Sequence, residues 1–165
     1  GITWGIGYDG GHQTARDIRA AWGMHAEVDR LAETAGLVGD RARTALPAYR
    51  DVVTPYPMAY DVFAGTSLPA YRSSTRTAFR APTFDALPAD AQGALVSLIY
   101  NRGASMTGSR NAEKRDIRDV CLPTADVRCI ATKLRAMCRL WAGTPNGQGL
   151  CNRREDEARL AESAA

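Results

Sequence analysis

The sequence has no long apolar run. No stretch approaches the roughly 20 apolar residues that a helix needs to cross a bilayer, so we predict no membrane span. Internal repeats, low-complexity tracts and linker-like segments are missing as well. The composition also excludes a disordered chain, because 45% of the residues are apolar and only 24% are charged. A chain of 165 residues with this composition predicts one compact domain over residues 1–165.

Motifs for nucleotides, metals and nucleophilic catalysis are missing too. There is no phosphate-binding loop, and the glycine-rich run 5–10 has no βαβ context, which excludes nicotinamide chemistry. No two cysteines have Cys-x-x-Cys spacing. The two histidines are interpreted as a turn residue, His12, and a structural or surface residue, His25. We therefore expect no metal and no cofactor.

Lysine is scarce. Only two of the 21 basic residues, Lys114 and Lys133, are lysines, and the others are arginines. Arginine suits carboxylates, phosphates and sugar hydroxyls, although a GC-rich genome produces the same bias. The net charge is only +3, and acidic residues alternate with the arginines. This pattern disfavours an arginine-rich nucleic-acid binder, so we expect no nucleic-acid partner.

All four cysteines lie after residue 120. Two short closures, Cys121–Cys129 and Cys138–Cys151, are the favoured pairing, and four free cysteines packed as small apolar groups are the alternative. Disulfides would indicate an oxidising compartment, the periplasm or the extracellular cell wall. The sequence shows no signal peptide, so the export route stays open.

Strand-forming residues are confined to the start of the chain. Residues 2–8 predict a strand or hairpin arm, and Asp9-Gly10-Gly11 predicts a turn. Helical patterns, with proline in first turns and glycine after last turns, follow at 14–22, 24–35, 38–48, 56–65, 68–80, 88–102, 110–121, 124–141 and 150–163. Segment 88–102 is the most apolar and should be the central, buried helix. The fold class predicted is α+β, predominantly α.

Thr3 and Asp9 are the first candidate site. With a two-residue period they share one strand face with Gly5 and Gly7, so a hydroxyl and a carboxylate would flank a floor without side chains. A carboxylate and a hydroxyl that hold a water are what an inverting glycosidase needs opposite its general acid. Alternatively, Thr3 is an ordinary strand residue and Asp9 starts a turn.

Tyr100, Asn101 and Arg102 are the second candidate site, at the end of the central helix. An aromatic ring packs on sugar rings, and an amide and a guanidinium bind hydroxyl and acyl groups. The alternative is a helix end capped by Gly103, where Arg102 interacts with the helix dipole.

Four motifs in order carry a resemblance that spans nearly the whole chain. They are Thr3-Trp4-Gly5-Ile6-Gly7-Tyr8-Asp9, the helix Ala94-Leu95-Val96-Ser97-Leu98-Ile99-Tyr100-Asn101-Arg102-Gly103, Arg139-Leu140-Trp141, and Gly149-Leu150-Cys151-Asn152-Arg153-Arg154-Glu155. Together they resemble the phage-type lysozyme (muramidase) family, nearest to pesticin-like bacteriocin and secreted-effector lysozyme domains.

The resemblance implies a small β lobe and a larger helical lobe around a cleft. It also implies an N-acetylmuramidase that cleaves the β-1,4 bond between N-acetylmuramic acid and N-acetylglucosamine with inversion, for cell-wall lysis. Thr3 and Asp9 match the family's catalytic Thr and Asp. Tyr100, Asn101 and Arg102, with Arg153 and Arg154, are the expected substrate-binding residues.

The family's general-acid Glu lies on a helix upstream of the Thr strand, and no Glu precedes Glu27 here. We therefore expect the chain to lack its N-terminal acid-bearing helix. Peptidoglycan strands are the expected partner, and an immunity protein and a separate N-terminal segment that supplies the Glu are candidate partners. The alternative function is a catalytically inactive peptidoglycan-binding module of lysozyme-like fold.

Overall fold

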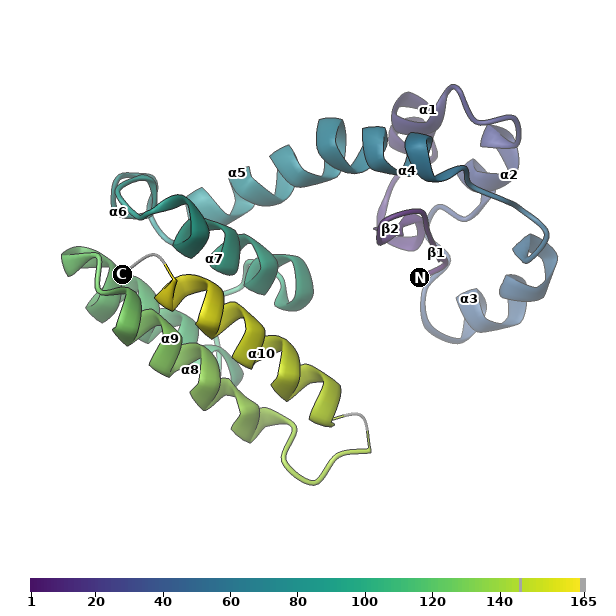
Figure 1. Cartoon of the computed structure of the whole chain (residues 1–165). Helices are drawn as coiled ribbons and strands as arrows, with labels where there is room; N and C mark the ends of the chain where they lie inside the picture. Colours follow the sequence, from purple (N-terminus) through teal and green to yellow (C-terminus); the bar gives the residue numbers. More distant parts are fainter. Residues whose placement is uncertain (146, 164–165) are drawn as a thin grey trace. The chain divides into compact units, whose positions relative to one another are not determined.

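The computed structural model describes residues 1–145 and 147–163. The chain divides into two compact units, Gly1–Ala70 and Tyr71–Ala165, which we call unit 1 and unit 2 (Figure 1). The single domain over residues 1–165 stays a prediction. Helices predominate and one two-stranded sheet is present, as the predicted class, α+β and predominantly α, requires.

Unit 1 holds the sheet and the α-helices α1 to α4. Its elements are β1 (Thr3–Trp4), β2 (Tyr8–Asp9), α1 (Ala15–Trp22), α2 (Val28–Glu33), α3 (Gly39–Ala45) and α4 (Tyr56–Val62). A π-helical segment, Phe63–Ser67, continues α4 into α5 (Leu68–Ala78), and the division between the units falls within α5.

The strand region is a hairpin, not one continuous strand. β1 and β2 pair antiparallel, with Thr3 opposite Asp9 and Trp4 opposite Tyr8. The chain reverses between them because Gly5 and Gly7 have φ angles of +55° and +68°, in the left-handed region that glycine adopts without strain. A single strand across both glycines was therefore the wrong expectation.

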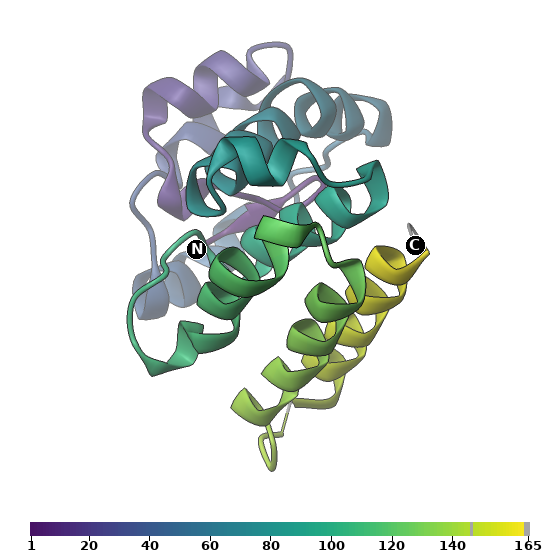
Figure 2. The same ribbon diagram turned by 90° about the vertical axis from the view of Figure 1, so that its left-hand side faces the viewer.

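All the elements of regular secondary structure described in unit 2 are helices. After α5 its α-helices are α6 (Ala81–Asp85), α7 (Ala89–Arg102), α8 (Ala112–Asp116), α9 (Val127–Ala136) and α10 (Gly147–Glu162). A π-helical segment, Ile117–Cys121, follows α8, and a 3₁₀ turn, Met137–Leu140, follows α9. Helix α10 packs against both α9 and α7 (Figure 2). The short helix α6 has no counterpart among the predicted helices.

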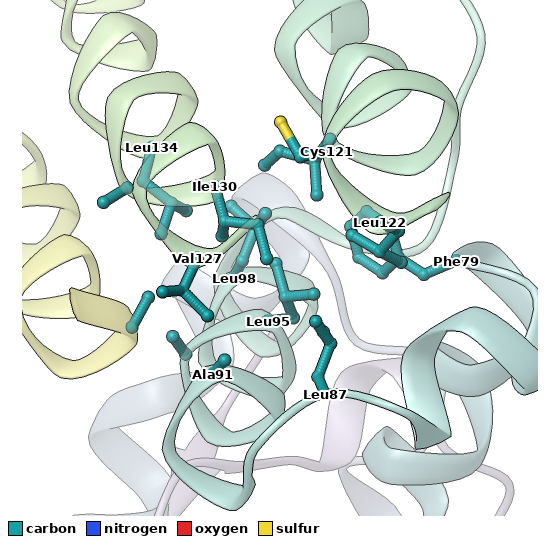
Figure 3. Packing of buried hydrophobic residues seen from close by; sticks show 14 of the residues in the cluster. Phe79, Leu87, Ala91, Leu95, Leu98, Cys121, Leu122, Val127, Ile130 and Leu134 are labelled. Carbon is teal, nitrogen blue, oxygen red and sulfur yellow. The ribbon is translucent and has the colours of Figure 1, made fainter. Parts of the chain in front are cut away.

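The core of unit 2 confirms the predicted central helix. Five residues of α7 are at most 1% exposed: Ala91, Ala94, Leu95, Leu98 and Ile99. They meet side chains from α9 and from the segment after α8, among them Ile130 and Leu122 (Figure 3). Unit 1 has its own aromatic core, in which the rings of Trp4 and Tyr8 lie 5.8 and 5.5 Å from that of Trp22.

Two disulfides, Cys121–Cys129 and Cys138–Cys151, confirm the favoured pairing. The first joins the π-helical segment to α9, and the second joins the 3₁₀ turn after α9 to α10. Such bonds suit an oxidising compartment. No helix in the described part of the chain is long and apolar enough to cross a membrane.

Both disulfides can be checked chemically. Thiol titration of denatured, unreduced protein should find no free thiol, because all four cysteines are paired. The same titration after reduction is the control and should find all four. Four thiols before reduction would contradict the pairing.

Candidate functional site

Thr3 and Asp9 are direct cross-strand neighbours. Opposite residues of an antiparallel pair project to the same side of the sheet, so the hydroxyl and the carboxylate share one face of the hairpin. The next pair, Trp4 and Tyr8, projects to the other face and packs on Trp22. Packing on Trp22 covers the hairpin face that carries the two aromatic rings. On the other face, Thr3 is exposed and Asp9 is half-buried.

The Asp9 carboxylate is held by backbone groups around the turn that it starts. Its Oδ1 accepts a hydrogen bond from the Gly11 amide at 3.1 Å, and the Gly1 nitrogen lies 2.9 Å from its Oδ2. His12 Nε2 lies 3.8 Å from the same Oδ2. Asp9 therefore starts a turn, as one interpretation predicted, and its carboxylate is also fixed in orientation beside Thr3.

Packing explains the two glycines that follow Asp9. A Cβ atom on Gly11 would lie 2.2 Å from the Leu37 carbonyl oxygen, and one on Gly10 would lie 2.4 Å from the Trp4 ring. No side chain fits at either position. The glycine floor predicted between Thr3 and Asp9 is absent, because Gly5 and Gly7 form the hairpin turn instead.

A pocket of about 450 Å³ opens beside Thr3. Residues from the first strand and from α3 and its end line it: Gly1, Ile2, Thr3, Gly39, Ala42, Arg43 and Leu46. Its walls are mainly apolar, and Thr3 and Arg43 are the lining residues with polar side chains. Unit 1 thus has a concave surface next to the Thr3–Asp9 pair.

The second candidate group lies at the end of α7 in unit 2. The Tyr100 ring makes an edge contact with Tyr71 at 4.8 Å, and the Arg153 guanidinium lies over the Tyr100 ring at 5.6 Å. Asn101 is exposed and Arg102 is partly buried. Arg153 also donates to Ser97 Oγ at 2.9 Å, so α10 supports the end of α7.

A pocket of about 290 Å³ adjoins this helix end, and we call it the Arg102 pocket. It is lined by Asn101, Arg102, Arg110, Trp141 and Leu150. The structure thus brings together Asn101 and Arg102 from the second candidate site and Trp141 from the third motif of the resemblance. Arg110, which the sequence did not single out, joins them because the chain folds back after Gly103.

Arg154 has a different environment from Arg153. It is fully buried, and its Nη2 donates to Glu157 Oε1 at 2.7 Å. Ser97 Oγ donates to the same oxygen at 2.7 Å. Burial raises the pKa of Glu157 and lowers that of Arg154. Such an enclosed ion pair supports the junction of α7 and α10 and places Arg154 out of reach of a ligand.

Two further buried charges were missed by the sequence analysis. Glu113 accepts two hydrogen bonds from the guanidinium of Arg139, which hold its pKa low although burial alone would raise it. Lys114 is fully buried, and its Nζ donates to the Gly103 carbonyl oxygen at 2.8 Å. Burial lowers the pKa of Lys114 to about 8. Nothing in the sequence around these two adjacent residues of α8 indicates that their side chains are buried.

Both histidines lie in unit 1. His25 is buried, its Nδ1 accepts the Glu27 amide at 3.0 Å, and its Nε2 lies 3.2 Å from the Val53 carbonyl oxygen, which confirms its structural role. His12 ends the turn that Asp9 starts. Within residues 1–145 and 147–163, no three His, Cys, Asp or Glu side chains gather closely enough to hold a metal ion.

Comparisons with protein-family models, with curated proteins and with solved structures return no match to this chain. The case for a function therefore depends on the residues and their geometry.

Proposed function

We propose a peptidoglycan hydrolase function for this chain, that of an inverting N-acetylmuramidase that acts in the periplasm or the extracellular cell wall. The observation that carries the proposal is the Thr3–Asp9 pair, a hydroxyl directly opposite a carboxylate on the open face of a hairpin. The four motifs of the chain resemble those of phage-type lysozymes, and the two disulfides suit the proposed compartment.

In this proposal Asp9 is the general base. Its carboxylate accepts a proton from a water molecule, and the Thr3 hydroxyl orients that water toward the anomeric carbon. Hydrogen bonds from the Gly11 amide and proximity to the Gly1 nitrogen keep the carboxylate oriented before substrate arrives. An inverting mechanism places this water opposite a general acid, which protonates the leaving oxygen. In this proposal a separate N-terminal segment supplies that acid as a Glu.

The glycan contacts are proposed for the end of α7. Tyr100 would pack its ring against a sugar, with Asn101 and Arg102 binding polar groups of the strand. Arg153 orients Tyr100 from α10, since its guanidinium lies over that ring. Arg154 is assigned a supporting role, because it is fully buried against Glu157.

Asp9→Asn is the decisive test. The full-length protein should release reducing ends from purified peptidoglycan, and Asp9→Asn should lower that rate by about 10²- to 10⁴-fold, the usual loss on removal of a general base. The asparagine oxygen can still accept from the Gly11 amide, so the turn should persist. Proton NMR of the first product should show the α-anomer, since a β bond is cleaved with inversion.

Asp29→Asn is the matched control, because Asp29 is an exposed carboxylate of unit 1 that pairs with Arg19 on the surface. It should keep wild-type activity. Equal activity of Asp9→Asn and wild type would overturn the role of Asp9. Peptidoglycan binding without release of reducing ends by wild type would favour the alternative, an inactive binding module.

A further inference from the structure

The Arg102 pocket carries an excess of positive charge. Two of its five lining residues are arginines, and none is acidic. Arg102 Nη2 donates only to neutral acceptors, the Arg110 carbonyl oxygen at 2.7 Å and Asn111 Oδ1 at 3.3 Å. In the described part of the chain, neither guanidinium has a hydrogen-bonded carboxylate. The pocket therefore presents cations whose charge is not neutralised by contact.

Glu113, the acidic group whose charge acts on Arg102, is already engaged. Glu113 binds Arg139 through both of its oxygens. Burial lowers the pKa of Arg102, and the charges of Arg110 and Arg139 lower it further, against the opposing effect of Glu113. A negative charge placed in the pocket would relieve this repulsion.

One donor of Arg102 is unused. Its Nε is buried and has no hydrogen-bond partner among the described residues. Buried polar atoms are nearly always paired, so the guanidinium of Arg102 keeps one unmet hydrogen-bond donor. A carboxylate can accept two parallel hydrogen bonds from a guanidinium, which few other groups match.

Besides the two arginines and Asn101, the wall of the Arg102 pocket is made of Trp141 and Leu150. The Arg102 guanidinium lies over the Trp141 ring at 5.3 Å. Leu150 adds an aliphatic surface, and the Cys138–Cys151 disulfide closes the segment that carries Trp141 and Leu150. The pocket thus suits an anionic group attached to a short organic chain, rather than a small inorganic anion.

We propose that the Arg102 pocket binds an organic carboxylate, that of the short peptides carried by peptidoglycan strands. The source of the carboxylate depends on the proposed function, whereas its recognition by Arg102, Arg110 and Trp141 does not. The pocket would then select strands that bear free acidic peptides over strands whose peptide carboxylates are amidated.

The test is a titration of the full-length, ¹⁵N-labelled protein followed by the indole N–H signal of Trp141, assigned with Trp141→Phe. The probes are N-acetyl-L-alanyl-D-glutamate, its diamide and inorganic phosphate, all at one ionic strength. We expect a saturable shift with the diacid and none with the diamide or phosphate. An equal shift with the diamide or with phosphate, or no shift at all, would overturn the proposal.

Variants locate the site. Arg102→Gln should weaken binding of the diacid about tenfold or more, the usual effect of losing hydrogen bonds to a charged group. Arg102→Lys keeps the charge without the planar fork and should be intermediate, which separates charge from geometry. Arg128→Gln is the control, since Arg128 is exposed on α9 away from the pocket lining, and should bind like wild type.

Unchanged indole signals of Trp4 and Trp22 would show that unit 1 is intact in each variant, and an unchanged circular dichroism spectrum would show that the helices persist. Wild-type binding by a folded Arg102→Gln variant would overturn the site. Hydrolysis is not needed for the readout. A protein that binds the diacid but releases no reducing ends would overturn the proposed function and leave the carboxylate pocket standing.

Discussion

Glu157→Gln is expected to lower the free energy of unfolding by about 3–5 kcal/mol, the usual cost of breaking a buried ion pair. Glu157 is 4% exposed and Arg154 is fully buried. Arginine cannot shed its proton at any ordinary pH, so the variant leaves a buried cation without its carboxylate. Arg154 Nε and Nη1 already lack partners among the described residues, so no second acceptor is at hand.

A double-mutant cycle isolates the pair. In Arg154→Met with Glu157→Gln the cation is gone, and the amide oxygen of the introduced glutamine can still accept from Ser97, as Glu157 Oε1 does. The double variant should therefore be more stable than Glu157→Gln alone, because replacing a whole buried pair costs far less than breaking it. Chemical denaturation of each variant supplies the four free energies.

An exposed pair on the same helix provides the control. Arg159 Nε lies 3.1 Å from Glu155 Oε1, but the Arg159 side chain is 70% exposed. Arg159→Met should leave the unfolding midpoint almost unchanged, since solvent screens such pairs. Strict additivity of the Arg154 and Glu157 substitutions would show that the two side chains do not act as a unit.

Because Lys114 is buried, we expect the free energy of unfolding to increase as the pH rises from about 8 to 10.5. Burial lowers the pKa of Lys114 from 10.5 to about 8. Between these values the unfolded chain binds a proton that the folded protein does not, so stability increases with pH. Below about pH 8 both states are protonated and the burial cost is fully present. The pKa difference corresponds to about 3 kcal/mol over this range.

The difference in unfolding free energy between wild type and Lys114→Met measures this effect, because other titrating groups cancel. It should shift in favour of wild type by about 3 kcal/mol between about pH 7 and pH 10.5. Lys133→Met is the natural control, since Lys133 is the other lysine and its Nζ pairs with Asp116 at 2.8 Å at a part-exposed position. A difference for Lys114→Met that stays flat with pH would contradict the buried, charged state.

Local sequence features predicted most of the helices and the disulfides. Proline in first turns, glycine after last turns and apolar periodicity act within a few residues, so they are legible in one sequence. The closures of Cys121 with Cys129 and of Cys138 with Cys151 are short as well. Helix ends were less accurate: α10 begins at Gly147, where residue 150 was expected.

The Thr3–Asp9 pair was predicted to share a face, and it does, for a different reason. The two residues face one another across a hairpin instead of alternating along one strand. Along one strand, side chains alternate between the two faces, so residues an even number of positions apart share a face. Across a hairpin, directly opposite residues also project to the same face. Both arrangements therefore place the hydroxyl and the carboxylate on the same side. The positive φ angles of Gly5 and Gly7 decided between them.

Long-range contacts were beyond the sequence. Ser97 meets Glu157 across 60 residues, and Arg139 meets Glu113 across 26. Neither pairing has a local pattern, because charged residues on a helix usually face solvent. The sequence by itself predicted the fold class, the favoured disulfide pairs and a shared face for the hydroxyl and the carboxylate. Only the tertiary structure decided which charges are buried and which two arginines line one pocket, because both depend on side chains that packing alone brings together.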